Sequence, residues 1–345
     1  MQYPLTEKIL PTDRKFGFEM DDYWVWCGSA IKGEDGRYHM FSARWSKERP
    51  FFSGYVVSSE IVRASSDTPF GPYKFEEVIL GDRGAEYWDG RMTHNPSIVK
   101  YGDTYALFYI GSTYKGERPD AEKLLSGDKS QMNECYANIK IGIATSKSIF
   151  GPWERQDKPV FDINPEGWDK TVVTTTAPCV LSDGIVLMYY RSNTPNGCKI
   201  GVAKAKDFFS PFERLTDHPI FDNYPEFAVE DPFVWQDGDT INLIAKDLRG
   251  NICDELWCGI HMISKDGVNF VLADEKKAYS RTVRFVDGTE EVAFHLERPN
   301  ITFKDGKPYF ISFAYGVGGG VLPQNGNSDF DSMTMSKTLI IPLAQ

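Results

Sequence analysis

Short apolar segments recur along the chain at intervals of roughly sixty residues, and each is followed by a turn and a second, aromatic-rich segment. In the clearest unit, residues 95–100 lead through a Gly-Asp turn to residues 105–109. A later unit has residues 177–180 and 186–190 on either side of an Asp-Gly turn. Segments of this length and composition, joined by such turns, are typical of paired β-strands.

Each unit continues with a third strand of small and β-branched residues and a closing segment, and five such units fill the chain. Radial repetition of four short antiparallel strands predicts an all-β, five-bladed β-propeller. We treat residues 1–345 as one propeller domain, with blades that begin near residues 22, 94, 176, 230 and 297. Residues 334–341 are expected either to complete the last blade or to close the ring against the first.

Longer polar segments fall between the second and third strands of several units. In a propeller, these loops return to the face on which the innermost strands begin. The longest spans residues 113–138, another covers residues 44–52, and shorter ones lie at 191–193 and 247–249. Because loops on a rigid scaffold usually carry recognition, we expect the functional site at this face.

Composition and charge exclude several classes of partner. The formal net charge is −11, whereas nucleic-acid binders usually carry a basic face, so we expect no nucleic-acid partner. No apolar run approaches the roughly 20 residues that span a bilayer, so no membrane partner is expected. Residues 1–5 lack the basic region and apolar core of a secretory signal, which leaves the cytoplasm open, or a periplasmic or secreted location reached after signal removal.

Two blade starts combine acidic residues with a proline at the entry to an apolar strand. Glu230-Asp231-Pro232 opens the fourth unit, and Glu297-Arg298-Pro299 opens the fifth. A single motif of this kind would be explained by strand entry or by pairing with an arginine such as Arg298. Two of them, with His94 and His295 beside blade starts, favour a functional site.

With these blade starts, the whole chain resembles the five-bladed propeller glycosidases, the superfamily of glycoside hydrolase families 43, 32, 62, 117 and 130, and families 43 and 117 in particular. The resemblance implies that carboxylates at the inner-strand starts converge on an axial pocket. There, one carboxylic acid protonates the leaving oxygen while a carboxylate activates water or attacks the anomeric carbon. Asp231 and Glu297 are the first catalytic candidates. Glu230 alternates with Asp231 along a strand, so only one of the two, with Asp231 as the candidate, is expected to face the axis, and the other to form a salt bridge or to bind a neighbouring loop.

The first unit departs from the family pattern, because Gly28-Ser29 stands where the relatives usually have Asp-Pro. The catalytic base is therefore expected from elsewhere, with Asp21 or Asp22 as the candidate. Asp22, Asp89 and Asp169 precede their units at similar spacing. These three aspartates predict a repeated acidic position above the pocket.

Other side chains near the blade starts are candidates for contacts with a sugar. A neutral imidazole of His94 or His295 can bridge to a hydroxyl or assist a carboxylate, and the resemblance to family 117 implies a histidine that acts as the acid. Aromatic planes of the loops, including Phe51 and Phe52, can stack on the C–H faces of sugar rings. The predicted substrate-binding residues are Glu230, Asp89, Asn95, Arg91, Trp45, Trp88 and Arg191.

Three functions follow from this pattern and stay open at this point. The first is hydrolysis of a terminal glycosidic bond of an oligosaccharide, by inversion as the resemblance implies, with Glu297 or a histidine as acid and an aspartate as base. The second is phosphorolysis, in which a basic cluster binds phosphate; its candidates are Arg44, Lys47, Arg49 and Arg91. The third is non-catalytic binding of glycans or proteins. The sequence leaves the sugar and the oligomeric state undefined.

No cofactor is required for any of these reactions. The chain has no acidic loop of calcium-binding form, so no metal ligand is assigned. The resemblance alone implies a structural divalent cation on the propeller axis.

Overall fold

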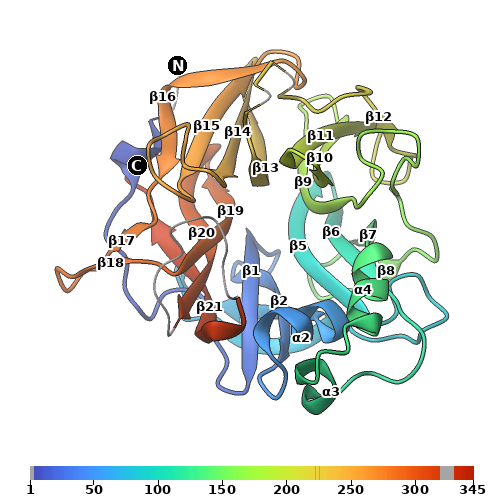
Figure 1. Cartoon of the computed structure of the whole chain (residues 1–345). Coiled ribbons are helices and arrows are strands. Elements are labelled where there is room, and N and C mark those ends of the chain that lie inside the picture. Colours follow the sequence, from blue (N-terminus) through green and yellow to red (C-terminus); the bar gives the residue numbers. More distant parts are fainter. Residues whose placement is uncertain (1–3, 222, 225, 319–329) are drawn as a thin grey trace.

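Five sheets form a ring in the computed structural model, which describes residues 4–221, 223–224, 226–318 and 330–345. Figure 1 looks onto this ring, and the first strand of each sheet lies nearest the centre. The prediction of an all-β, five-bladed propeller is confirmed.

Four blades are complete four-stranded antiparallel sheets, each formed in chain order from the axis outward. The first two blades comprise β1 (Tyr23–Lys32), β2 (Tyr38–Ser46), β3 (Glu60–Ser66) and β4 (Lys74–Leu80), then β5 (Met92–Tyr101), β6 (Thr104–Ser112), β7 (Lys140–Ser146) and β8 (Glu154–Arg155). The next two comprise β9 (Thr174–Val180), β10 (Val186–Thr194), β11 (Gly197–Ala205) and β12 (Glu213–Arg214), then β13 (Val229–Asp237), β14 (Thr240–Asp247), β15 (Gly259–Ser264) and β16 (Phe270–Tyr279).

Both ends of the chain contribute to the fifth blade. Its sheet contains β19 (His295–Lys304), β20 (Lys307–Gly318) and β21 (Met333–Pro342). The outer edge of β21 pairs with the N-terminal segment, because Phe18 and Thr338 exchange two backbone hydrogen bonds of 2.9 Å. The C-terminal strand therefore completes the last blade, and the N-terminal segment joins that blade to the first.

Apolar side chains pack between neighbouring blades rather than in one central core. Phe108 and Met188 belong to one buried cluster of the second and third blades, and Met40 and Phe310 belong to another, of the first and fifth blades. Burial of one such side chain contributes about 1.5–3 kcal/mol. The axis is thus left free for the polar residues of the inner strands.

Most of the short helices lie in the connections between second and third strands. The helices are α1 (Leu5–Lys8), α2 (Phe51–Ser58), α3 (Ala121–Leu125), α4 (Ser130–Ala137) and the 3₁₀ helix η1 (Phe330–Ser332), and a small hairpin of β17 (Thr282–Arg284) and β18 (Glu290–Val292) precedes the fifth blade. Helix α2 contacts both α3 and α4, so the long loops of the first two blades share one face, as expected.

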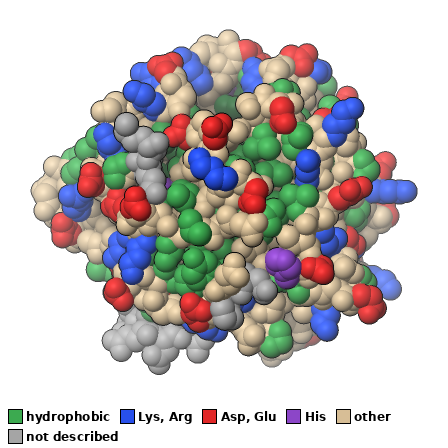
Figure 2. Space-filling view, turned by 90° about the horizontal axis from the view of Figure 1, so that it is seen from above, with side chains coloured by type: hydrophobic (Ala, Val, Ile, Leu, Met, Phe, Trp, Pro, Cys, Tyr) green, Lys and Arg blue, Asp and Glu red, His purple; other side chains and the backbone are tan. Residues whose placement is uncertain are grey.

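The surface is mixed in charge on the side that Figure 2 shows, where acidic and basic side chains are interspersed around apolar ones. This side therefore presents no continuous basic surface. None of the helices in the described part of the chain is long and apolar enough to cross a membrane.

Each inner strand contains a β-bulge at the same point, where two residues lie opposite one residue of the second strand. The first residue of each bulge has a positive φ between 45° and 57°. These residues are Cys27, Asn95, Thr175, Asp231 and Arg298. Because a left-handed conformation is costly for residues with a Cβ, especially β-branched ones, five equivalent cases mark a constraint of the fold.

The bulges correct the alignment of the first and third units. In the first unit, the residues equivalent to Asp231-Pro232 are Cys27-Gly28 rather than Gly28-Ser29. In the third unit, they are Thr175-Thr176 rather than the Ala-Pro pair. The proline of the third unit is therefore displaced by two residues from the bulge. No carboxylate occupies the bulge of the first blade among the described residues.

A buried aspartate holds the edge of the second blade. Asp89 is fully buried and accepts hydrogen bonds from Arg83 Nε (2.7 Å), Tyr109 Oη (2.7 Å) and Arg155 Nη2 (2.8 Å). Trp88 stacks on Tyr109, with 5.8 Å between ring centroids. We call this set the blade lock.

The third blade repeats this lock. Asp169 accepts hydrogen bonds from Tyr190 Oη (2.9 Å) and Arg214 Nε (2.8 Å), and Trp168 stacks on Tyr190. A Cβ at Gly201 would lie 2.6 Å from both rings, which explains the repeated Ile-Gly pair of the third strands. Asp89 and Asp169 therefore do form a repeated position, but it stabilises blades.

Replacing Asp89 by alanine should lower the free energy of unfolding by about 3–5 kcal/mol, because two partly buried arginines lose their carboxylate. Urea denaturation measures this change. The matched control is Asp22→Ala, since Asp22 is exposed and a surface substitution should change stability by no more than about 0.5 kcal/mol. If both variants changed the free energy of unfolding by the same small amount, the blade lock would not stabilise the fold.

Candidate active site

A pocket of about 190 Å³ opens at the mouth of the ring, somewhat larger than the ~150 Å³ cavity that holds benzene in an engineered protein. It therefore accommodates about one ring of a ligand. The bulge residues and the residues before them form most of its floor. The lining residues are Trp26, Trp45, Phe51, Phe52, Tyr55, His94, Asn95, Tyr136, Thr174, Thr175, Arg191, Glu230, Asp231, Glu297, Arg298 and Phe330.

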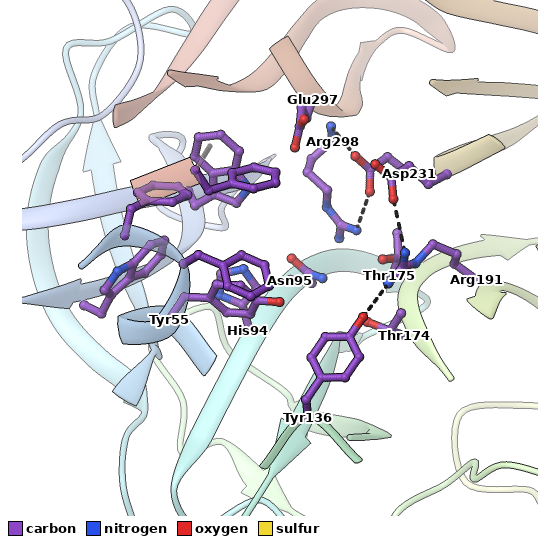
Figure 3. A pocket seen from close by; sticks show the side chains of 16 residues that line it. Tyr55, His94, Asn95, Tyr136, Thr174, Thr175, Arg191, Asp231, Glu297 and Arg298 are labelled. Carbon is purple, nitrogen blue, oxygen red and sulfur yellow. Dashed lines mark hydrogen bonds and ion pairs between the residues drawn. The ribbon is translucent and has the colours of Figure 1, made fainter. Parts of the chain in front are cut away.

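The pocket has two chemically different walls. Blade one, α2 and η1 supply six aromatic side chains, and Tyr55 stacks on His94 with 4.6 Å between ring centroids. Blades three to five supply the charged residues, which Figure 3 shows across the pocket from Tyr55, with the Arg298 side chain extending between the walls. A ligand in the pocket thus meets aromatic rings on one side and charged groups on the other.

The bulge explains why two successive acidic residues line the same pocket. We expected alternation along the strand to turn only one of Glu230 and Asp231 toward the axis. The structure differs, because both line the pocket, although Glu230 does form salt bridges, with Arg191 and Lys246. The bulge begins at Asp231, which has φ 57°, and a bulge interrupts the two-residue alternation of side chains.

A buried lysine connects two of the carboxylates. Lys246 lies opposite Glu230 in the strand register, is 2% exposed, and places its Nζ 3.0 Å from Glu230 Oε1 and in contact with Glu297 Oε1. Arg191 Nη1 donates to the other oxygen of Glu230 at 3.2 Å. Although burial opposes ionisation, Lys246 and Arg191 lower the pKa of Glu230. Glu230 therefore stays ionised.

Glu297 is held from a second side by a histidine. His295 is fully buried, and its Nδ1 lies 2.8 Å from Glu297 Oε1. Its ring is stacked between Trp257 and Phe330, at centroid distances of 5.4 and 4.4 Å. Burial again opposes ionisation, but Lys246 and His295 hold the pKa of Glu297 well below its usual value.

Asp231 differs from the two glutamates. Burial raises the pKa of Asp231 to about 6; Arg298 opposes the shift and the negative charge of Glu230 adds to it. Arg298 Nη1 lies 3.1 Å from Oδ1, and the Arg298 backbone N–H donates to Oδ2 at 3.3 Å. Asp231 is therefore the carboxyl group of the pocket that most readily carries a proton.

The two predicted histidines occupy different places. His94 lines the pocket, and its Nδ1 lies 2.8 Å from Ser59 Oγ. Burial and the charge of Arg298 lower the pKa of His94 well below its ordinary value, so its ring is neutral. His295 is not among the described lining residues and contacts the site through Glu297.

Several predicted site residues lie elsewhere in the described structure. Asp22 is exposed and does not line the pocket, so the structure does not join it to Asp231 and Glu297. Asp89 and Trp88 belong to the blade lock. Arg91 donates to Asp82 and to the carbonyl of Gly116, each at 3.2 Å.

The remaining predicted binding residues do line the pocket: Trp45, Asn95, Arg191 and Glu230, with the loop aromatics Phe51 and Phe52. Asn95 Oδ1 accepts a hydrogen bond from the Cys27 thiol at 3.3 Å. The loops at 44–52, 113–138 and 191–193 therefore each contribute, as expected, whereas residues 247–249 contribute no described lining residue.

Sequence reasoning missed Lys246, although a signal was present. It follows the wholly buried apolar run Leu243-Ile244-Ala245 in a central strand, where an unpaired charge would be very costly. A lone lysine there indicates a buried acidic partner. Tyr55, Tyr136 and Thr174 were also missed, and nothing in their local sequence distinguishes them from ordinary packing residues.

The axis does not offer a good site for the cation that the resemblance implies. Among the described residues, no group of three or more His, Cys, Asp or Glu side chains could hold a metal ion. The space below the pocket is lined by neutral groups such as Ser97 and Asn300 together with Arg298, whose positive charge opposes a cation.

Comparison with solved structures identifies relatives of the fold. Zg3597, a family 117 glycoside hydrolase of the marine bacterium Zobellia galactanivorans, matches with a TM-score of 0.66 and 17% identity, over 97% of this chain and 89% of that one. The catalytic domain of a Coprinopsis cinerea GH62 α-L-arabinofuranosidase matches with a TM-score of 0.61 and 13% identity, over 99% of this chain and 98% of that one. An endo-arabinase from Bacteroides thetaiotaomicron matches with a TM-score of 0.57 and 14% identity, over 96% of this chain and 98% of that one.

No protein-family model and no curated protein matches the sequence. At these identities the structural matches establish a shared fold. The resemblance to five-bladed propeller glycoside hydrolases is thereby confirmed at the level of architecture.

Replacing Lys246 by methionine should destabilise the protein by about 3–5 kcal/mol at neutral pH, because Glu230 and Glu297 become buried charges without their shared partner. In the wild type, their lowered pKa values contribute stability that is present above the unfolded value near 4.3 and lost as the pH falls. The gap between variant and wild type should therefore narrow as the pH falls below about 5. Urea denaturation from pH 3 to 8 measures it.

The control is Lys147→Met, which removes an exposed ion pair with Asp103 and should cost no more than about 1 kcal/mol at any of these pH values. A Lys246 variant as stable as this control at pH 7 would show that the buried cluster is not held by the ammonium group.

Proposed function

We propose that the protein is a glycoside hydrolase that removes a terminal sugar from an oligosaccharide. One observation carries the proposal: three carboxyl groups of two adjacent blades open into a pocket of single-ring size, opposite an aromatic wall. Glycoside hydrolysis needs one carboxyl group that gives a proton and another that is ionised. Asp231 and Glu297 fulfil these two requirements.

The charges assign roles that differ from those implied by the resemblance. Asp231 is the proton donor, since its pKa of about 6 leaves it partly protonated near neutral pH. Glu297 is the ionised partner, because Lys246 and His295 stabilise its negative charge. His295 acts by positioning Glu297.

The shape of the pocket favours a terminal sugar over an internal one. Its volume of about 190 Å³ lies below the 300–1,000 Å³ of sites for larger ligands. Sugar C–H faces pack on aromatic rings, which Phe51, Phe52 and Tyr55 provide, while hydroxyl groups find partners in Arg191 and Asn95. The glycoside hydrolases among the structural matches support a carbohydrate substrate.

Phosphorolysis is less well supported. None of its predicted phosphate ligands is among the described lining residues of the pocket. Arg44 pairs with Glu60, Arg49 donates to the carbonyl of Pro119, and Arg91 pairs with Asp82. Within the pocket, Arg191 and Arg298 are engaged by Glu230 and Asp231. A phosphate requirement for sugar release would nevertheless favour it over hydrolysis.

The Asp231→Asn and Glu297→Gln variants should each lose about 10²–10⁴-fold in kcat, the usual contribution of a positioned acid or base, while remaining folded. Release of monosaccharide from a panel of plant and algal oligosaccharides and p-nitrophenyl glycosides, with and without phosphate, measures activity. Asp22→Asn is the control and should keep wild-type activity. Undiminished activity in either site variant would refute the assigned roles, and a panel without any cleaved member would refute the function.

The pH dependence of kcat/KM reports the titration of the free enzyme. As the pH rises through about 6, Asp231 loses the proton that it must donate, so kcat/KM should decline on the alkaline side. Initial rates between pH 4 and 9 measure the profile. A rate that stays constant from pH 6 to 8 would exclude Asp231 as the acid.

A further inference from the structure

We propose that a halide ion binds on the propeller axis, in a small cavity directly below the pocket. This site goes beyond the proposed hydrolysis and does not depend on it. All five inner strands contribute to the wall of the cavity, whose volume of about 20 Å³ holds one occupant of about the size of a water molecule. Three features of this wall carry the proposal: an unpartnered hydroxyl group, an amide of fixed orientation, and a positive charge.

The bulges of the inner strands determine which residues surround this cavity. In every blade, the residue that follows the bulge residue lines it. Glycine has no side chain, and proline has neither a polar side chain nor a backbone N–H. Thr176 is therefore the one member of this ring with a polar side chain. The ring consists of Gly28, Pro96, Thr176, Pro232 and Pro299.

The hydroxyl group of Thr176 lacks a partner in the protein. Thr176 is 3% exposed, and its buried Oγ1 has no hydrogen-bond partner among the described residues. Buried hydroxyl groups are normally hydrogen-bonded, so an exception indicates an occupant of the adjoining space, such as an ion or an ordered water. The hydroxyl group can donate its hydrogen to an anion on the axis.

A chain of hydrogen bonds fixes the orientation of the Asn300 amide, which also lines the cavity. The Ile98 backbone N–H donates to Ser29 Oγ at 3.0 Å, and the Ser29 hydroxyl group donates to Asn300 Oδ1 at 3.1 Å. Since Ser29 has a single hydroxyl hydrogen, the amide must turn its oxygen toward Ser29. The NH₂ group, which only donates, is therefore the part of this amide that is available to an axial ligand.

Arg298 makes the cavity electropositive. It lines both this cavity and the pocket above, whereas none of the described lining residues of the cavity is acidic. Burial raises the pKa of the Cys27 thiol, which lines the cavity, to about 12, and the positive charge of Arg298 opposes this rise. Donor groups and a positive charge around so small a space favour a monatomic anion over a cation, and the size excludes phosphate, sulfate and carboxylates.

Such an ion also acts on the proton donor of the proposed reaction, a consequence that rests on the proposed function. The charged groups that face Asp231 are Arg298, Glu230, Lys246 and Glu297. A negative ion beside Arg298 weakens the attraction that keeps Asp231 ionised, so it should raise the pKa of Asp231 further. The alkaline decline of kcat/KM should then lie at higher pH in sodium bromide than in sodium gluconate. An unmoved decline in a protein that binds bromide would refute this coupling.

Thermal unfolding of the wild-type protein tests whether a halide binds, with bromide as the probe. Sodium bromide and sodium gluconate are compared at equal ionic strength, because gluconate has the same charge but is too large for the cavity. The Tm should rise with bromide along a saturating curve, by about 2 °C at ten times the dissociation constant. Equal Tm values in the two salts at every concentration would overturn the proposal.

The Thr176→Val variant tests whether the cavity is the place of binding. Valine keeps the shape of threonine, and removal of an unpartnered hydroxyl group should leave the Tm in gluconate unchanged or higher. The rise of Tm in bromide should fall to less than half. The control is Thr174→Val, since Thr174 belongs to the same strand but lines the pocket, and it should keep the full rise. A wild-type rise in the Thr176 variant would refute the assignment to this cavity.

Anomalous scattering from wild-type crystals grown in sodium bromide locates the ion directly. The expected peak lies in the cavity, among Thr176, Asn300 and Arg298. Density there without an anomalous signal would identify a water and overturn the proposal, as would bromide peaks at the molecular surface alone. A peak in the cavity without any rise of Tm in solution would show binding at crystal concentration only, which also overturns it.

Discussion

The bulge in each inner strand is the constraint on which the site depends. A regular strand turns successive side chains to opposite faces, so it offers the axis one residue in two. By placing one residue in the left-handed region, each blade instead offers two successive side chains to the pocket, with Cys27 as the one bulge residue outside the described lining. Five short strands thereby supply a floor dense in functional groups, and the inter-blade cores hold that floor in place.

The buried charges of this floor are organised by Lys246. Taking three carboxyl groups out of water is costly, and one ammonium group compensates two of them. The third, Asp231, pairs with Arg298 and lies beside Glu230. Its burial is only partly compensated, and its pKa is therefore raised. The ion pairs of Lys246 thus make the cluster compatible with folding and also separate the protonation states of its carboxyl groups. One pocket then holds both a carboxyl group that can give a proton and ionised carboxylates.

Much of this architecture could be predicted from the sequence, because strand length, turn type and repeat spacing are local properties. The blade number follows from them, whereas the convergence of Asp231 and Glu297 on one pocket was implied by the resemblance to the propeller glycosidases. The bulge register could not be predicted, since positive φ at Cys27 or Thr175 leaves no mark in a hydrophobic pattern. Asp89 and Asp22 look equivalent by spacing, yet only Asp89 meets the arginines that bury it. Such differences depend on contacts between distant strands.

The central claim is that a terminal sugar is cleaved between the aromatic wall and the carboxylate wall. A crystal structure of the Glu297→Gln variant with an oligosaccharide from the activity screen tests it most directly. The terminal ring should lie against Phe51 and Tyr55, with the glycosidic oxygen about 2.6–3.2 Å from an oxygen of Asp231. A sugar bound outside this pocket, or a glycosidic oxygen remote from all three carboxyl groups, would contradict the account.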